Sequence, residues 1–247
     1  HSEEGRMSHW YDKDGAPHHE VEGKGGNLRP TTLRDARKYG WVPSVSSIWK
    51  DMVAAPGLVR WSQGILFETM YLNQLHGPET EHDYRKRVFD IHKTESTKAA
   101  ERGTMIHGIL ENYFVNGVGA PGYGSLIKGT EAKLLEICGK QDWKIEQSFA
   151  HPMGFGGQID MYSDEWVVDW KTKELDDGKK PDMYDSYSVQ LAAYDHGIGG
   201  GRKLLNLFVS VTSPGYVYAH QWEEKERLFK MFSTALDLWK LIKRYDP

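Results

Sequence analysis

Cysteine is nearly absent from this chain of 247 residues, in which Cys138 is the single thiol. One cysteine cannot form an intrachain disulfide. It also cannot supply the four thiolates of a cysteine-ligated zinc site or iron–sulfur cluster. A sequence without disulfides fits a reducing compartment, so we expect the protein to work inside a cell, in the cytoplasm.

Long apolar runs are also missing. A membrane-spanning helix needs about 18 or more predominantly apolar residues in succession, and no stretch of the chain provides them. The start of the chain shows no charged segment followed by an apolar one, as a secretory signal would. Residues 1–6, which precede Met7, could be the remnant of an expression tag, and the fold is considered without them. We expect no association with a membrane.

Positive charge is not in excess either, since the formal net charge is −4. This balance counts against a protein that coats nucleic acid regardless of sequence. It is compatible with an enzyme whose site is locally basic around acidic metal ligands. Aromatic residues are plentiful, with nine tryptophans and thirteen tyrosines. Most of them are expected to pack in the core, and a minority could be platforms on which nucleobases stack.

Composition divides the chain into three parts. Residues 1–42 are polar and rich in glycine, which predicts an irregular segment with a hairpin or short helix near TLRDARKYG. Residues 43–98 show helical spacing of apolar residues, interrupted at Ala55-Pro56-Gly57. Residues 99–247 begin with a helical pattern and continue with strand-like runs. We expect this last part to be the core domain.

The core domain has the pattern of an α/β fold. Three short strand-like runs follow one another, WKIEQSFAHP, GGQIDMYS and EWVVDWKTK. A polar loop then leads to the helical pattern YDSYSVQLAAYDHGI, two further strand-like runs and a closing helix. A short mixed β-sheet flanked by helices is the natural packing for this order.

The run EWVVDWKTK is unusual because a strand with so many apolar residues also carries Asp169 and Lys171. Burying an unpaired charge is costly, so these residues need a reason. Side chains two apart lie on one face of a strand, and Asp160 lies on the preceding strand. The two carboxylates can therefore converge, and a hard divalent cation would relieve their repulsion. Many surface hairpins would carry this spacing by chance, so the pattern alone is a weak signal.

The arrangement D…D-x-K resembles the PD-(D/E)XK nuclease superfamily, with Asp160, Asp169 and Lys171 at the three signature positions. Ile159 stands where the motif is named for proline, a position that varies in the superfamily. The resemblance implies a restriction-endonuclease-like core. It covers roughly residues 99 to 215.

Further elements resemble the RecB-like branch of this superfamily. Gln190 and Tyr194 match a Q-x-x-x-Y helix, which could also be an ordinary amphipathic helix. Gly103 and His107 match a G-x-x-x-H helix, whose histidine could also be structural. The pair Gly156–Gly157 matches glycines beside which the backbone approaches DNA, or it could mark a hairpin turn. All the elements occur in the order of the branch, and no iron–sulfur cluster is possible with one cysteine.

The resemblance implies a deoxyribonuclease that hydrolyses phosphodiester bonds with Mg²⁺ or Mn²⁺. The metal ligands that it implies are His107, Asp160, Asp169 and the backbone carbonyl of Trp170. The family expectation is a product with a 5′-phosphate and a 3′-hydroxyl.

The resemblance also implies roles for the remaining site residues. Lys171 would position the attacking water and stabilise developing charge, and Gln190 and Tyr194 would place the phosphate or the strand. Glu111 is one helical turn after His107, so it could orient that histidine or belong to the site. Glu146, on the strand before Asp160, could be an outer carboxylate of the site or a solvated strand residue.

Residues 43–98 resemble, more loosely, the helical region of phage-encoded RecB-like exonucleases and of the mitochondrial genome maintenance exonuclease. Helices that arch over the site could admit only a free DNA end. The residues that we expect to contact DNA are Trp49, Lys50, Arg60 and Trp61, with Lys179 and Lys180 in a later loop. Alternatively, Trp49, Trp61 and Phe67 pack on the core, and the loop lysines are simply solvated.

The sequence therefore predicts a metal-dependent exonuclease that acts on single-stranded DNA or DNA ends. Its expected setting is phage recombination, replication or DNA processing, in the host cytoplasm and with partner proteins of those processes. A structure-specific or restriction-type endonuclease on the same core is an alternative. A non-catalytic DNA-binding descendant is another, although the signature residues Asp160, Asp169, Lys171 and Gln190 are all present. No Walker-type phosphate-binding motif occurs.

Overall fold

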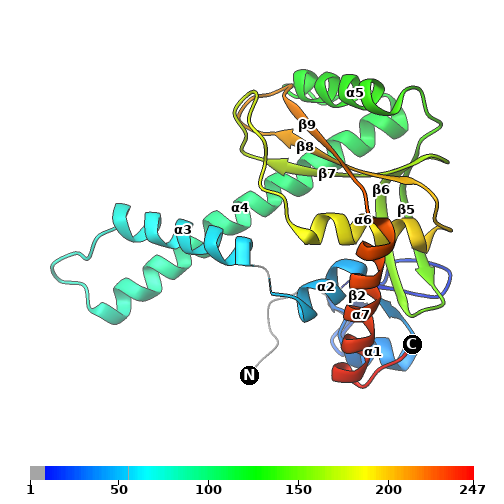
Figure 1. Cartoon of the computed structure of the whole chain (residues 1–247). Coiled ribbons are helices and arrows are strands. Elements are labelled where there is room, and N and C mark those ends of the chain that lie inside the picture. The colour runs from blue at the N-terminus through cyan, green and yellow to red at the C-terminus, as the bar shows by residue number, and fades with distance from the viewer. Residues whose placement is uncertain (1–8, 55) are drawn as a thin grey trace.

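The computed structural model describes residues 9–54 and 56–247, and its centre is a five-stranded mixed sheet (Figure 1). The order of strands across the sheet is also their order in the chain. The strands are β5 (Lys144–His151), β6 (Phe155–Tyr162), β7 (Trp166–Lys173), β8 (Lys203–Ser210) and β9 (Val217–Trp222). This architecture confirms the predicted α/β fold class.

The directions of the strands explain how the site residues come together. β5, β6 and β7 form an antiparallel meander, whereas β7 and β8 are parallel and β9 is again antiparallel. A parallel pair needs a crossover, and helix α6 (Asp185–Gly197) provides it. The helix that carries Gln190 is therefore the next element in the chain after the strand that carries Asp169.

Helices cover both faces of the sheet, with a hydrophobic cluster under each layer. One layer consists of α2 (Val45–Met52), α6 and α7 (Lys225–Lys243), and the other of α5 (Gly124–Cys138) and the C-terminal half of α4 (Glu81–Asn116). On β7, Val167 belongs to the α6 cluster, whereas Val168 and Trp170 belong to the α4 cluster. Because side chains alternate along a strand, Asp169 and Lys171 face the α6 layer.

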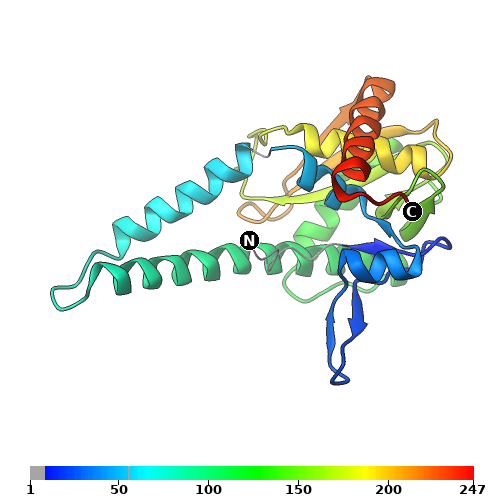
Figure 2. The same cartoon turned by 90° about the horizontal axis from the view of Figure 1, so that it is seen from below.

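The N-terminal part is more ordered than the sequence predicts. β1 (Trp10–Tyr11) pairs with β4 (Val42–Pro43), and β2 (Glu20–Glu22) pairs with β3 (Leu28–Pro30) in a hairpin that projects from the body (Figure 2). The short helix α1 (Leu33–Tyr39) follows. Thr32 and Asp35 cap its start reciprocally, and Gly40 ends it with a φ of 73°. The predicted irregular segment thus contains both a hairpin and a helix, and residues 1–6 lie outside the described residues.

Helices α3 (Pro56–Leu72) and α4 form an arm that extends away from the sheet (Figures 1 and 2). α4 has 36 residues and crosses the predicted boundary between residues 98 and 99 without a break. No helix in the described residues is long and apolar enough to span a membrane, because even α4 is rich in charged residues. The arm and the sheet therefore share one helix.

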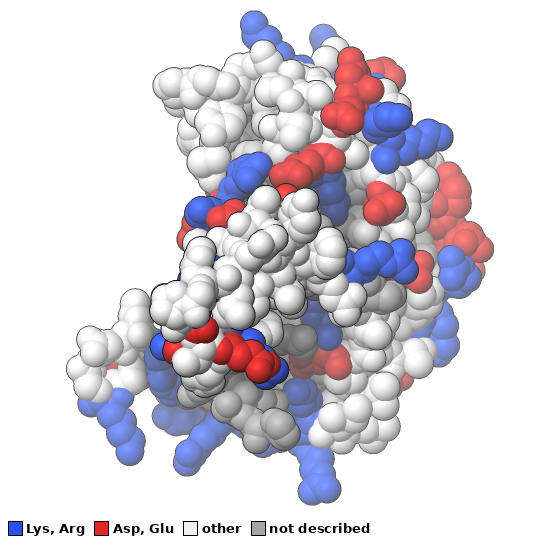
Figure 3. Space-filling view, turned by 90° about the vertical axis from the view of Figure 1, so that its left-hand side faces the viewer, with Lys and Arg blue, Asp and Glu red and all other residues white. Residues whose placement is uncertain are grey.

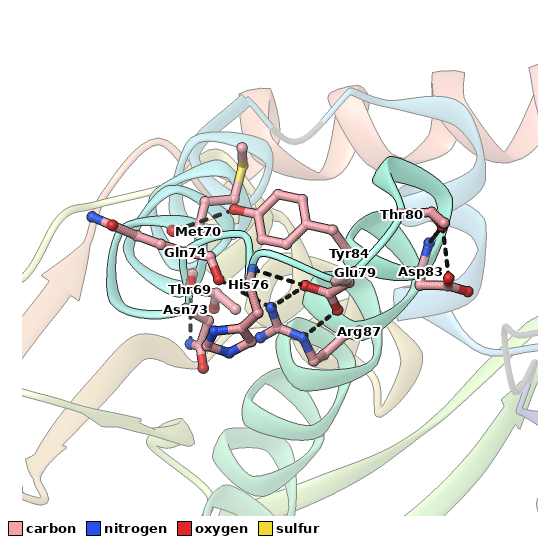
Figure 4. A network of polar contacts seen from close by, with 10 residues as sticks. All are labelled: Thr69, Met70, Asn73, Gln74, His76, Glu79, Thr80, Asp83, Tyr84 and Arg87. Atoms are coloured by element: carbon pink, nitrogen blue, oxygen red, sulfur yellow. Dashed lines mark hydrogen bonds and ion pairs between the residues drawn. The ribbon is translucent and has the colours of Figure 1, made fainter.

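The turn at the tip of the arm is held by a polar network (Figure 4). The guanidinium of Arg87 donates to both carboxylate oxygens of Glu79 at 2.8 Å and to the carbonyl of Gln74 at 3.1 Å. Thr80 caps α4. The hydroxyl of Tyr84 donates to the carbonyl of Met70. This side-chain network fixes the angle at which α3 meets α4.

Candidate active site

The site begins where strands β6 and β7 separate. Their pairing ends at Met161 and Val168. One residue earlier on β6, the Oδ2 atom of Asp160 accepts a hydrogen bond of 3.0 Å from the N–H of Trp170. The Asp160 carboxylate thus replaces a backbone acceptor and stands in the fork between the strands, opposite Asp169.

Asp169 is buried, and both of its carboxylate oxygens are hydrogen-bonded. Its Oδ1 atom lies 2.7 Å from the Nζ of Lys171, and its Oδ2 accepts a bond of 2.6 Å from the Nδ2 of Asn206. Asn206 is its register partner on β8, and the Oδ1 of Asn206 accepts a bond of 2.7 Å from the indole of Trp222. A buried charge is tolerated when it is paired and its lone pairs are filled. The apolar strand can carry Asp169 for this reason.

Lys171 links the sheet to α6. Its Nζ, besides contacting Asp169, donates to the Oε1 of Gln190 at 3.2 Å. The Nε2 of Gln190 in turn donates to the hydroxyl of Tyr194 at 2.9 Å, one helical turn away. Burial, and then the charge of Asp169, raise the pKa of Tyr194, so its hydroxyl keeps its proton. The predicted Q-x-x-x-Y helix therefore lies against the D-x-K strand.

His107 comes from α4, on the opposite side of the fork from α6. Its Nδ1 atom lies 3.9 Å from the Oδ1 of Asp160, and its ring meets the indole of Trp170 edge-on at 6.3 Å. Burial is the largest cause of the lowered pKa of His107. A neutral imidazole is the form that binds metal ions, and this one lies beside the first carboxylate.

Two glutamates extend the acidic surface of the site. Glu146 is half-buried on β5, opposite Asp160 in the strand register, and its backbone has a left-handed φ of 51°. Its carboxylate accepts a bond of 2.6 Å from Gln158. Burial first, and then the charge of Glu111, raise the pKa of Glu146 to about 7. Glu146 and Glu111 thus lie close enough to interact, and Glu146 is not a fully solvated strand residue.

The carboxylates of Asp160 and Asp169 are ligands of the type that a hard divalent cation prefers. Burial, followed by the neighbouring charge of Asp169, raises the pKa of Asp160, as expected where one carboxylate lies near another. A cation would relieve the repulsion between them. In the described ranges, no three His, Cys, Asp or Glu side chains are already grouped to hold an ion. The Lys171 ammonium lies against Asp169, where it supplies the positive charge.

Close packing within the protein explains the glycine pair before Asp160. Both residues are buried within β6, not in its turn. A Cβ atom on Gly157 would lie 2.6 Å from the ring of Tyr194, and one on Gly156 would lie 2.7 Å from the carbonyl of Phe149. The hairpin-turn interpretation is therefore wrong, and the approach of DNA to this backbone stays a prediction. The glycines allow the Tyr194 ring and the neighbouring strand to approach closely.

The aromatic residues of the helical region divide into two groups. Trp49 is partly buried and packs against the α6-side core, as the alternative interpretation predicts. Trp61 and Phe67 on α3 are instead 45% and 72% exposed, so core packing does not explain them. Lys50 and Arg60 are exposed as well.

The base of the arm lies close to the site. A Cβ atom on Gly57, at the start of α3, would meet the ring of Tyr184, which precedes α6. On α4, the residue Gly103 approaches Thr172 of β7 in the same way. Burial, and then the charge of Asp182, raise the pKa of Tyr184, and the charge of Arg60 opposes this rise. The start of α3 and the C-terminal half of α4 therefore lie beside the fork.

The loop after β7 carries exposed Lys179 and Lys180. The carbonyl of Lys179 accepts a bond of 2.7 Å from the hydroxyl of Tyr216, which anchors the loop. Burial, and then the charge of Lys180, lower the pKa of His220 on β9. These lysines are not in contact with the hydrogen-bond network of Asp169 and Lys171.

Sequence reasoning missed several residues of the site. Asn206 and Trp222 hold Asp169 from the neighbouring strands, and no local motif marks them. Lys173 and Tyr187 also line this side, with the Nζ of Lys173 5.4 Å from the centre of the Tyr187 ring. Lys173 could have been predicted from the sequence as a residue of the site, because it is two residues from Lys171 and so lies on the same face of the strand.

Comparisons with known proteins identify distant likenesses of fold. No protein-family model matches the chain, and no curated protein matches it. An alkaline exonuclease from Laribacter hongkongensis, LHK-Exo, is 12% identical, with 81% of this chain and 87% of that chain covered and a TM-score of 0.44. The structure of SSO0001 is 12% identical, with 72% and 86% covered and a TM-score of 0.34. Likenesses this distant carry no argument about activity, so function must be inferred from the site itself.

Proposed function

We propose that this protein is a metal-dependent deoxyribonuclease that removes nucleotides from single-stranded DNA or DNA ends. The observation that supports it is one connected network. Asp160 and Asp169 flank the fork, Lys171 bridges Asp169 and Gln190, and Gln190 bonds to Tyr194. A merely structural hairpin has no need of two convergent carboxylates and a lysine shared with a separate helix.

The residues that would hold Mg²⁺ or Mn²⁺ are Asp160, Asp169, the backbone carbonyl of Trp170 and His107. When bound, the ion would supply Lewis-acid stabilisation of the phosphate and lower the pKa of a coordinated water. Asn206 orients Asp169 by a hydrogen bond to the oxygen that Lys171 does not contact. A metal-binding carboxylate that is held in this way does not have to reorient when the reaction occurs.

Lys171 would act on the reacting atoms. Its ammonium already lies between a carboxylate and an amide, so two of its three donor directions are fixed. The third donor can serve the attacking water or a phosphate oxygen. Apolar neighbours on β7 lie beside the fork, and a less polar setting strengthens such electrostatic contacts. Gln190 and Tyr194 would set the position of the lysine and of the phosphate.

The arm favours an exonuclease over an endonuclease. The start of α3 and the C-terminal half of α4 lie beside the fork, and α3 exposes Trp61 and Phe67, on which bases of a single strand can stack. The sequence resemblance suggests a role in phage recombination, replication or DNA processing in the host cytoplasm, together with proteins of those processes.

The test uses end-labelled linear single-stranded and duplex DNA and circular single-stranded DNA, each with Mg²⁺, Mn²⁺ or EDTA. The variants are Lys171→Ala and, as a control, Lys203→Ala, an exposed lysine on the adjacent strand β8. We expect metal-dependent degradation of the linear DNA by wild type and the control only. Cutting of the circle would indicate an endonuclease. DNA binding without cleavage under any metal would overturn the enzymatic proposal in favour of a non-catalytic binding protein.

A further inference from the structure

A basic groove lies on the N-terminal part, between the β2–β3 hairpin and α1. It has a volume of about 570 Å³, and its lining side chains are Lys24, Arg29, Arg34, Asp35, Arg37 and Lys38. Five of these six residues are cationic, in a chain whose net charge is −4. Lys and Arg side chains also project along the lower edge of the molecule in Figure 3, on the side where Figure 1 shows α1 and α7. Positive charge is therefore concentrated here.

Most of this charge is not neutralised within the protein. The one carboxylate of the groove, Asp35, is paired with Arg29 through bonds of 2.7 and 2.9 Å. Arg37 donates to the carbonyl of Lys243, and Lys38 donates to the hydroxyl of Tyr39, neither of which is an anion. Within residues 9–54 and 56–247, no ion pair joins Lys24, Arg34, Arg37 or Lys38 to a carboxylate. Four cations thus remain to attract an external anion.

An aromatic stack adjoins the groove. The ring of His18 stacks on Trp41 at 4.2 Å with an interplanar angle of 4°, and Tyr39 stacks on Trp41 at 4.7 Å with an angle of 25°. Tyr39 is the outer member and is 52% exposed. The Nζ of Lys38 lies 2.9 Å from its hydroxyl, so cation and ring are presented together. Three stacked rings form a rigid support for a further planar group.

We propose that the β2–β3 hairpin and α1 form a second nucleic-acid-binding surface, on which a single strand lays its phosphates in the basic groove and stacks a base against Tyr39. Cations that follow a backbone, combined with an exposed aromatic ring that already carries a cation at 4.6 Å, are suited to an unpaired strand. A duplex would keep its bases away from the ring, and an acidic peptide would have no use for it. The inference rests on the proposed function only in its choice of nucleic acid as the ligand.

The position of this surface suits a role in holding the substrate. The same N-terminal segment reaches the candidate site, because a Cβ atom on Gly156 of β6 would lie only 3.0 Å from the ring of Tyr11 on β1. Residue Ser44 forms a parallel β-bridge with Gly156 of β6, which attaches the segment to the sheet. A strand held in the groove is thus held by a part of the protein that packs against the catalytic strands.

The test measures binding of fluorescent single-stranded oligonucleotides by the full chain in EDTA, over a range of salt concentrations. The variants are Arg34→Ala/Lys38→Ala, Tyr39→Ala and Tyr39→Phe. The control is Lys128→Ala/Lys140→Ala, which removes the same charge from exposed positions elsewhere. Circular dichroism checks that each variant is folded.

We expect the groove double variant to bind roughly tenfold or more weakly, with a salt slope shallower by up to about 1.4, since each phosphate contact contributes about 0.7 for a single strand. Tyr39→Ala should weaken binding roughly tenfold, whereas Tyr39→Phe keeps the ring and the affinity. The control should bind as wild type does.

Two results would overturn the inference. The first is that the groove variants bind single-stranded DNA as well as the control does. This result would say nothing against cleavage by wild type, so the proposed function would be unaffected. The second is that Arg34→Ala/Lys38→Ala weakens binding to single-stranded DNA and to polyglutamate equally, while Tyr39→Ala has no effect. This result would indicate a surface that binds any polyanion. Conversely, groove-dependent binding by a protein that never cleaves DNA would support this inference while the proposed function fails.

Discussion

Asn206 holds Asp169 from the next strand at two points. Its Nδ2 atom donates to the Asp169 side chain at 2.6 Å and to the Asp169 backbone carbonyl at 3.0 Å. These bonds tie the parallel pairing of β7 and β8 to the orientation of one carboxylate. The sheet therefore fixes the geometry of the site as well as supporting it.

The first prediction follows from this relationship. Asn206→Ala leaves the Oδ2 of Asp169 and the indole N–H of Trp222 without their buried partners, which should lower the free energy of unfolding by about 1–3 kcal/mol. Trp222→Phe removes only the hydrogen bond from Trp222 to Asn206, so it should lower the free energy of unfolding by less. Urea denaturation of both variants measures the difference. An Asn206→Ala variant as stable as wild type would show that these bonds do not hold Asp169.

A second prediction separates the chemistry of Asp160 from its structural role. Asp160→Asn can still accept the bond from Trp170 and removes a charge whose pKa burial has raised, so stability should be unchanged or higher. Cleavage should fall at least about a hundredfold, because a metal ion contributes several kcal/mol and tenfold in rate is about 1.4 kcal/mol. Thermal unfolding and nuclease assays on the same preparation test both parts. Unchanged cleavage would remove Asp160 from the site.

A third prediction concerns the pH dependence of stability in metal-free buffer. The pKa of Glu146 rises from 4.5 to about 7 on folding, mainly through burial. An acid that binds its proton more tightly in the folded state stabilises the fold most below pH 4.5, and this contribution is lost as the pH rises through 7. Glu146→Gln should therefore gain melting temperature relative to wild type as the pH rises from 5 to about 8. A difference that does not change with pH would contradict this assignment.

The fourth prediction concerns the reactivity of the single thiol. Burial raises the pKa of Cys138 to about 12, because the residue lies in the cluster between α5 and the sheet. At pH 8, its thiolate fraction should be roughly a thousandfold below that of a free cysteine. Alkylation with iodoacetamide should be slow in native buffer and fast in denaturant. Rapid labelling of the folded protein would mean that α5 opens readily.

A fifth prediction tests the exposed aromatic residues of the arm. Phe67→Ser changes an exposed side chain, so the free energy of unfolding should stay within about 0.5 kcal/mol of wild type. Degradation of single-stranded DNA should nevertheless slow, since a stacking surface is lost. Trp49→Ala is the contrasting variant, and it should destabilise the protein because Trp49 packs against the core. Equal DNA degradation by Phe67→Ser and wild type would remove the arm from substrate binding.

The sequence could predict the fold class and the central residues because their signals are local. Asp169 and Lys171 are two residues apart on one strand, and Gln190 and Tyr194 are one helical turn apart. Each spacing fixes a common face before any tertiary contact is known. The meander and the crossover helix then bring these faces together.

The remaining features depend on contacts between distant parts of the chain. Asn206 looks like an ordinary polar residue until β8 pairs with β7 in register. Gly157 resembles a turn glycine until Tyr194, from a later helix, packs onto it. The stack of His18, Trp41 and Tyr39 likewise forms only when the N-terminal segment folds back on itself. No local pattern carries such information.

The continuity of α4 has a mechanical consequence. Arg87, which clamps the turn at the tip, and His107, beside Asp160, belong to the same helix, and the residues between them span about 30 Å at the rise of an α-helix. The helix contains no proline at which it could bend. A displacement of the tip would therefore be passed along one continuous helix to the imidazole. If the arm binds DNA as proposed, pulling on the bound strand would also shift His107.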